Sequence, residues 1–286
     1  MRNILLQTAA LFLLFSALAF GQESPYFVTY DHHLEEPGNL DIEVSGTSNI
    51  PSSSQRFSIA PYMEFEYGVT ANWTTELYLE GQGTWNDSTI FTGWRIENRF
   101  RPLKREHLIN PVLYLEYENI NEASKILKEI EGDAPDLTSS NAVLRGEADH
   151  ELEGKLILSS NVKGWGISEN MIAEKAVNDN ESWQFGYALA AARPLALMGT
   201  GRPCIVCRQN FAAGAELFGG LGTRYNFGVK QTQQYFAPTV AFNTPHGTTF
   251  KFSPEFGLND NSAGVLWRFG VSYEIQQFRD WFRRKQ

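Results

Sequence analysis

Most residues of this chain that could do chemistry are charged side chains placed at every second position. Glu64-Phe-Glu66 and Glu116-Tyr-Glu118 are examples, each with an apolar residue between two carboxylates. Side chains two apart point to the same side of a β-strand, so each run would put two charges on one face. Such a face suits a charged passage or a network of ion pairs.

We single out the charges that fall near the middle of the expected strands. They are Glu64, Glu66, Glu76, Glu80, Arg95, Glu97, Arg99, Glu116, Glu118 and Arg268. Crowded carboxylates repel one another, so we expect the arginines to pair with them. Two interpretations stay open: a passage whose field favours cations, and an interior closed by salt bridges that only hold the wall together.

Cys204-Ile-Val-Cys207 is a second candidate group, in the turn between two expected strands. In an exported protein two nearby cysteines most simply form a disulfide. Metal binding or redox chemistry is the alternative. Arg208 follows the second cysteine, so the haem-attachment pattern, which needs histidine there, does not fit.

The histidines give no recognisable catalytic pattern. One cluster on an irregular segment holds residue types that bind metals, but its adjacent histidines point in different directions: Asp31, His32, His33, Glu35 and Glu36. The other histidines have no serine or aspartate partner pattern: His107, His150 and His246. We assign no catalytic residue, no metal site and no cofactor.

The elements that would position these charges are long strands. From Phe57 to Tyr67, and again from Trp73 to Glu80, apolar and polar residues alternate with a period of two. Each strand runs about eleven residues, which suits a tilted crossing of a bilayer and exceeds the usual ~5–6 of a soluble sheet. A short turn joins them into a hairpin.

The same alternation recurs through residues 39–275 without a linker, which predicts one domain of about twelve antiparallel strands. The expected strands are 39–48, 57–67, 73–83, 88–100, 110–119, 147–160, 165–176, 182–193, 208–220, 233–242, 248–258 and 264–275. Helical spacing over residues 121–132 predicts one short loop helix. Residues 276–286 form a charged tail.

Residues 1–21 read as a cleaved signal peptide, with one early arginine, an apolar run and small residues before the cut. Residues 22–38 then form an N-terminal arm, which we expect in the periplasm. The formal net charge is −9, and removing Arg2 with the signal peptide makes it −10. An acidic exported chain is a poor candidate for nucleic-acid binding.

A soluble sandwich and a membrane barrel both need one apolar face on every strand, so the polar face must decide between them. Here that face is rich in carboxylates, while Trp and Tyr lie near strand ends on the apolar face, as in the two aromatic girdles of a membrane barrel. The sequence therefore predicts an all-β transmembrane barrel in the bacterial outer membrane, with its apolar face against lipid.

Two stretches, residues 61–82 and 151–175, resemble the outer-membrane family named for the meta-pathway of phenol degradation. The matching features are Glu64, Glu66, Gly68, Thr70, Glu76, Glu80, Lys155, Asn170 and Glu174. The likeness is a repeated hairpin style that covers most of residues 39–275. It implies a transporter-like barrel for small, often hydrophobic molecules. The charged carboxyl end departs from the pattern.

Our first hypothesis is an outer-membrane channel or transport route for a small molecule, with lipid and solute as partners. The second is a barrel with a closed lumen that has a structural or partner-binding role. An outer-membrane hydrolase is third. The solute, the oligomeric state and any gate stay open at this point.

Overall fold

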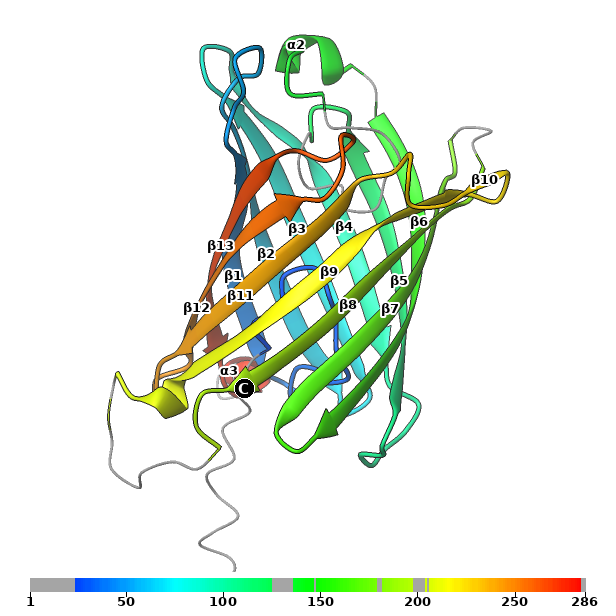
Figure 1. Ribbon diagram of the computed structural model, residues 1–286. Coiled ribbons are helices and arrows are strands. Elements are labelled where there is room, and N and C mark those ends of the chain that lie inside the picture. The colour runs from blue at the N-terminus through cyan, green and yellow to red at the C-terminus, as the bar shows by residue number, and fades with distance from the viewer. Residues whose placement is uncertain are drawn as a thin grey trace, which may run out of the picture.

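A closed ring of antiparallel strands forms the protein (Figure 1). The computed structural model describes residues 24–124, 136–146, 148–178, 182–197, 204 and 206–283. The ring consists of β1 (Leu40–Asn49), β2 (Ser58–Thr70), β3 (Trp73–Thr84), β4 (Thr89–Phe100), β5 (Asn110–Asn121), β6 (Ala148–Val162), β7 (Trp165–Ala176), β8 (Gln184–Pro194), β9 (Phe211–Thr223), β11 (Gln234–Asn243), β12 (Thr248–Gly257) and β13 (Val265–Ile275).

The ring closes where the last strand meets the first. β13 pairs with β1 from Leu40 opposite Ile275 to Asn49 opposite Leu266. β8 and β9 also pair along their length, so the ladder continues around the whole ring. The predicted antiparallel barrel of twelve strands is confirmed. We call the end where β1 begins and β13 ends the terminal rim, and the other end the distal rim.

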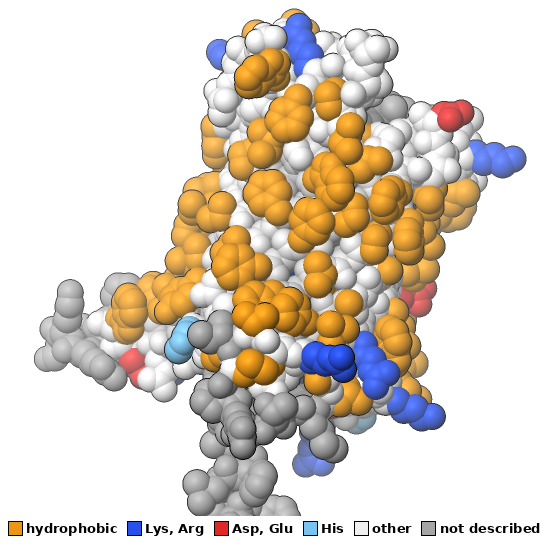
Figure 2. Space-filling view, turned by 60° about the vertical axis from the view of Figure 1, so that its left-hand side comes forward, with side chains coloured by type: hydrophobic (Ala, Val, Ile, Leu, Met, Phe, Trp, Pro, Cys, Tyr) orange, Lys and Arg blue, Asp and Glu red, His pale blue; other side chains and the backbone are white. Residues whose placement is uncertain are grey.

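Alternation along each strand separates a lipid face from a lumen face. On β3, Leu77 and Leu79 are 38% and 40% exposed, whereas Glu76 and Glu80 are each 2% exposed. Figure 2 shows apolar side chains covering the face of the outer wall in view, with lysines and arginines toward its two ends. Burying carboxylates while exposing leucines makes sense only if the outside is lipid. Among the described residues, no helix is long and apolar enough to cross a membrane.

The differences from the predicted elements are local. A two-residue strand that the alternation did not predict, β10 (Asn226–Phe227), pairs with the end of β9. β9 begins later than expected because a 3-10 turn, η1 (Arg208–Asn210), precedes it. The short helices are α2 (Asn141–Leu144) and α3 (Phe278–Arg283), the second in the charged tail. Most of the helix predicted over 121–132, and the signal peptide, lie outside the described residues.

The tight turn between β6 and β7 requires a glycine at position 164. Lys163 and Gly164 both have positive φ, at 53° and 82°. Two-residue hairpin turns of this kind need positive φ at both positions, which glycine adopts without cost.

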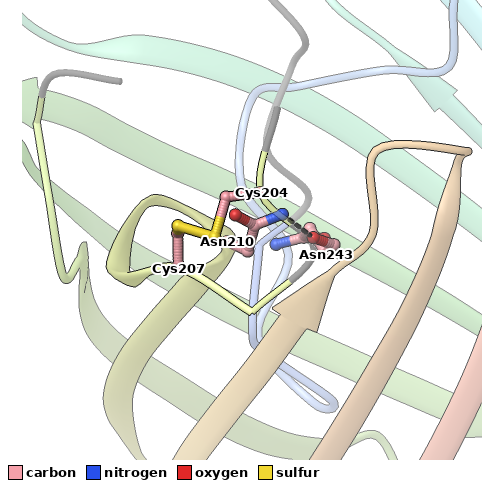
Figure 3. Close-up of a disulfide and its surroundings, with 4 residues drawn as sticks. All are labelled: Cys204, Cys207, Asn210 and Asn243. Carbon is pink, nitrogen blue, oxygen red and sulfur yellow. Dashed lines mark hydrogen bonds between the residues drawn. A yellow bond between two sulfur atoms is a disulfide. The ribbon is translucent and has the colours of Figure 1, made fainter. Parts of the chain in front are cut away.

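The connection from β8 to β9 carries the disulfide Cys204–Cys207 (Figure 3). Beside it, Asn210 donates a hydrogen bond from Nδ2 to the carbonyl oxygen of Asn243 at 2.8 Å, which ties this connection to the end of β11. The disulfide lies at the terminal rim and links two cysteines that are only three residues apart in the sequence.

Replacing Cys204 and Cys207 by serine is expected to leave the barrel folded. A loop this short restricts the unfolded chain little, so we expect a loss of at most about 2 kcal/mol. The urea midpoint of the barrel in detergent measures it. Failure of the double variant to show a folded, heat-modifiable band on a denaturing gel would mean that the bond is needed for assembly.

The N-terminal arm differs most from expectation. We expected residues 22–38 to lie in the periplasm, but residues 24–36 run inside the ring, where the blue segment can be followed between the strands (Figure 1). Val28 packs in a buried cluster with Tyr62 and Tyr78 of the wall. The arm lies there because the lumen offers it both apolar contacts and hydrogen-bond partners.

Gly68 marks the place where the arm leaves the lumen. A Cβ on this residue would lie 2.1 Å from the carbonyl oxygen of Glu36. Gly38 donates its N–H to Gly68 at 2.7 Å. Only glycine allows the main chain of the arm to cross β2 this closely.

Candidate functional site: a charged lumen occupied by the arm

Eight carboxylates stand side by side across eight neighbouring strands. In order from β13 and β1 through β7 they are Glu274, Asp41, Glu66, Glu76, Glu97, Glu116, Glu153 and Glu174, each directly opposite the next. We call them the acidic row. Like charges directly opposite in a sheet are destabilising, so this arrangement needs cations in the neighbouring positions.

Arg99 supplies one of these cations to three members of the acidic row at once. Its Nη2 contacts Oε1 of Glu66 at 2.5 Å and also contacts Oε1 of Glu76, and its Nε lies 3.1 Å from Oε1 of Glu97. Arg99 is 7% exposed. One guanidinium therefore joins β2, β3 and β4 on the lumen side.

Arg95 makes a second junction nearer the distal rim. Its Nε contacts Glu80, and its Nη1 lies 3.2 Å from Oε1 of Glu116. The guanidinium carbon is 4.3 Å from the ring centre of Tyr78. The predicted pairing of these arginines with carboxylates is therefore present in the structure.

The remaining lumen cations pair on other strands. Lys155 contacts Glu153 at 2.8 Å, Lys251 contacts Glu43 at 2.7 Å, and Arg268 contacts Glu255 at 2.8 Å. Arg268 thus lies on β13, four strands around the ring from Arg95 and Arg99 on β4. The sequence grouped these three arginines, but the fold separates them.

Two carboxylates differ from their neighbours. Within the described part of the chain, neither Glu64 nor Glu118 makes an ion pair with lysine or arginine. Each lies on the same strand as a member of the acidic row and two residues away from it, Glu64 from Glu66 and Glu118 from Glu116. Among the residues that the structure describes, carboxylate oxygens within 4.8 Å of one another form three groups that could hold a metal ion by geometry alone. The groups are Glu64, Glu66 and Glu76; Glu116, Glu118 and Glu153; and Glu118, Glu151 and Glu174.

Wall side chains bind the main chain of the arm. Glu216 accepts the N–H of Phe27 at 2.7 Å and that of Val28 at 3.1 Å. Asn170 accepts the N–H of Tyr30 through Oδ1 at 2.7 Å and donates from Nδ2 to the carbonyl of Tyr30 at 2.9 Å. The arm is therefore held at fixed positions on β7 and β9.

The aromatic rings of the arm lie against lumen cations. The ring centre of Tyr30 is 4.9 Å from Nζ of Lys155 and 5.0 Å from Cζ of Arg99. Phe27 lies 5.3 Å from Nζ of Lys251 and 5.9 Å from Cζ of Arg268. Cation–π attraction at such distances contributes about 0.5–2 kcal/mol. The hydroxyl of Tyr30 also donates to Glu97 at 2.9 Å.

A serine, a histidine and a carboxylate meet where the arm returns to the terminal rim. Nδ1 of His32 is 2.5 Å from Oγ of Ser159, and its Nε2 is 3.8 Å from Oε1 of Glu106. Ser159 is only 3% exposed, and its oxygen also accepts the N–H of His32 at 2.9 Å. With the serine oxygen shielded and engaged in this way, the group serves as an anchor for the arm.

The two adjacent histidines of the arm have opposite electrostatic environments. Burial lowers the pKa of His32, and the neighbouring His33 lowers it further. A hydrogen bond to Asp31, at 2.9 Å from Nδ1, raises the pKa of His33. Burial opposes ionisation of Asp31, but the hydrogen bonds from His33 and the charges of His33 and His32 together outweigh burial and lower the pKa of Asp31. Asp31 and His33 thus pair with each other, while His32 faces Ser159.

A cavity of about 360 Å³ remains between the arm and the wall. Carboxylates outnumber cations in its lining, which includes Glu35, Glu43, Glu64 and Glu66 beside Lys251. The arm therefore narrows the lumen without filling it, and the space left is acidic.

Sequence reasoning found most of the wall charges but not their arrangement. Among the chosen residues Glu66, Glu76, Glu97 and Glu116 share the acidic row. The sequence alone did not point to Glu216, Phe27 or Tyr30, which position the arm, and it pointed to Asn170 only as part of the family resemblance. The alternation of β7 and β9 predicts that Asn170 and Glu216 face the lumen, but nothing in the sequence pairs them with residues about 140 to 189 positions away.

Comparison with solved structures supports the fold. An outer membrane channel from Pseudomonas putida F1 superimposes with a TM-score of 0.54 at 10% identity, covering 87% of this chain and all of that one. The KdgM porin in complex with disordered oligogalacturonate gives 0.47 at 8% identity, covering 82% and 98%. No family model and no curated protein matches the sequence. The likeness to the Pseudomonas putida channel supports the closed antiparallel barrel fold of an outer-membrane protein.

Proposed function

We propose that this barrel conducts small solutes across the outer membrane, that its lumen prefers cations, and that the N-terminal arm restricts passage. The observation that carries the proposal is the acidic row, which continues across eight strands beside a residual cavity. Fixed carboxylates lining a narrow passage raise the local concentration of cations and repel anions.

The resemblance to the family of the meta-pathway of phenol degradation adds an expectation about the solute. Members of that family take up small, often hydrophobic molecules. In this chain the arm brings Phe27 and Tyr30 into the lumen, where rings lie beside cations. An aromatic solute could make the same contacts, so an aromatic or otherwise apolar solute belongs to this proposal.

Neutralising Glu64 and Glu118 is expected to reduce cation preference. In planar bilayers with a salt gradient, Glu64→Gln with Glu118→Gln should shift the reversal potential toward the anion side, because two acidic groups leave the lining of the lumen. These positions are chosen because neither carboxylate is paired with a lysine or arginine in the described chain, so no cation loses its partner.

Glu169→Gln provides the matched control. This carboxylate lies on β7 but is exposed on the outside of the barrel. Glu169→Gln removes one carboxylate outside the lumen and should leave the reversal potential unchanged. If the lumen double variant folds and conducts with unaltered selectivity, the acidic wall does not set the ion preference.

Acidification is expected to loosen the arm through His32. Its pKa is lowered in the docked arm, so the undocked arm takes up a proton first as the pH falls below the ordinary value of 6.5. The stability of the docked arm is therefore fully present above that pH and is lost as the pH falls toward the lowered pKa. His33, with its raised pKa, acts in the opposite direction, but its side chain is mostly exposed and screened.

Liposome swelling between pH 7 and pH 5 measures this effect. We expect flux to rise several-fold in the native protein and to rise less in His32→Gln, which cannot take up a proton. Asp31, Glu106 and Arg101 also face His32. Because both proteins keep these three groups, the difference in flux between them at each pH reports the protonation of His32. An equal rise in both would assign the pH response to wall carboxylates.

A closed barrel with a structural or partner-binding role is the second candidate. The main-chain and aromatic contacts of the arm favour it, because they would also suit a permanent plug. Liposome swelling with folded protein separates the two: flux of small sugars or amino acids supports the channel, and its absence at all pH values supports the closed barrel. Hydrolase activity is third, and Ser159→Ala tests it.

A further inference from the structure

The lumen contains a set of side chains that bind peptide main chain. Asn170 pairs with both the N–H and the carbonyl of Tyr30, as a neighbouring β-strand would. Oγ of Ser168 donates to the same carbonyl. Glu216 accepts two successive main-chain N–H groups, from Phe27 and Val28.

These contacts do not depend on the side chains of the arm. Every residue except proline offers an N–H and a carbonyl, so a peptide that adopts the conformation of the arm, with its bends at residues 27, 28 and 32, can make the same bonds with Asn170, Ser168 and Glu216. Each of the three wall residues is at least nine-tenths buried, so their hydrogen bonds form away from bulk water. Leaving such groups unpaired costs about 1–3 kcal/mol each, so the wall gains from binding an occupant.

Selectivity for particular side chains comes from two sites in the lumen, which hold arm residues three positions apart in the sequence. The first holds Phe27 beside Lys251 and Arg268, and the second holds Tyr30 between Lys155 and Arg99. Tyr30 also packs on Tyr114, with ring centres 5.1 Å apart. Both places suit an aromatic ring, since the cations lie near its face.

We propose that the lumen is a binding site for short peptides with two aromatic residues three positions apart, and that the arm is its resident occupant. This inference rests on the proposed channel function and names a solute class for it. The excess of carboxylates around the cavity also attracts the ammonium group of a free peptide N-terminus.

The arm must be weakened before a second peptide can bind. A tethered segment competes at an effective concentration of about millimolar, so a free copy of the same sequence is excluded from the native protein. The full chain carrying Phe27→Ala and Tyr30→Ala keeps every wall residue and loses the two rings. A heat-modifiable band on a denaturing gel confirms that this variant is folded.

The binding experiment uses a labelled peptide with the sequence of residues 24–34, SPYFVTYDHHL, and the weakened full-length variant in detergent. We expect saturable binding at least about tenfold tighter than that of the same peptide with alanine at the Phe27 and Tyr30 positions. Adding Asn170→Ala to the protein should weaken binding of the first peptide about tenfold. Equal binding of both peptides, or no effect of Asn170→Ala in a folded barrel, overturns the inference.

A flux experiment separates this inference from the channel proposal. Liposomes containing the weakened variant are tested with the tetrapeptide Phe-Val-Thr-Tyr and with a trisaccharide of similar mass. Faster swelling with the tetrapeptide supports peptide selectivity. Equal rates together with unselective binding refute the peptide site and leave the channel intact, whereas no flux of either solute with selective binding refutes the channel alone.

Discussion

Solute flux is expected to rise about tenfold or more when Phe27 and Tyr30 are both replaced by alanine. Truncating a large aromatic side chain in a packed site costs about 3–5 kcal/mol, and these rings are only partly buried, so we take about 2 kcal/mol for each. A combined loss of about 4 kcal/mol shifts a docked-to-undocked equilibrium of the arm by roughly a thousandfold. The rate of liposome swelling with small neutral solutes measures the result.

Tyr225→Ala with Phe227→Ala is the matched control for this prediction. Both aromatics are exposed, at 74% and 66%, beside β10 on the outside of the ring. Their loss removes a similar apolar area without touching the lumen. Unchanged flux in the folded Phe27 and Tyr30 variant would mean that the arm is not the barrier to passage.

Alternation was enough to predict the wall of this protein from its sequence. β7, for example, begins and ends at the predicted residues, Trp165 and Ala176. Lipid outside and a polar lumen inside impose a strict period of two on every strand, and this pattern is local. Such a signal can be read without knowing which strands are neighbours.

The acidic row could not be predicted in the same way. Whether Glu97 lies opposite Glu76 and Glu116 depends on the register between strands, which the turns set. The register of β3 with β4 even shifts at a bulge between Glu80 and Gly81. The sequence therefore predicted which charges face inward but not which of them meet.

The position of the arm depends on contacts between distant parts of the chain. Residues 24–38 have no alternation, and their partners lie on β7 and β9. A segment without a regular period reads as a loop outside the barrel. Its aromatic residues were the available signal, because Phe27 and Tyr30 would be poorly placed in water.

Arg99→Gln is expected to have the largest effect of any single substitution in the wall. It would leave Glu66, Glu76 and Glu97 without their shared guanidinium, and breaking a buried ion pair by removing one partner costs about 3–5 kcal/mol. Because the cavity allows some screening of the remaining carboxylates, we expect Arg99→Gln to lower the free energy of unfolding by about 3 kcal/mol. The urea midpoint of the folded barrel in lipid vesicles measures the loss.

Two further variants test whether charge causes this loss. Arg105→Gln removes an exposed arginine from the turn between β4 and β5 and should change the midpoint little. Adding Glu76→Gln to Arg99→Gln removes one of the uncompensated carboxylates and should restore part of the stability, because fewer like charges then face one another in the acidic row. If Glu76→Gln gives no recovery, the packing of the Arg99 side chain, and not its charge, joins these three strands.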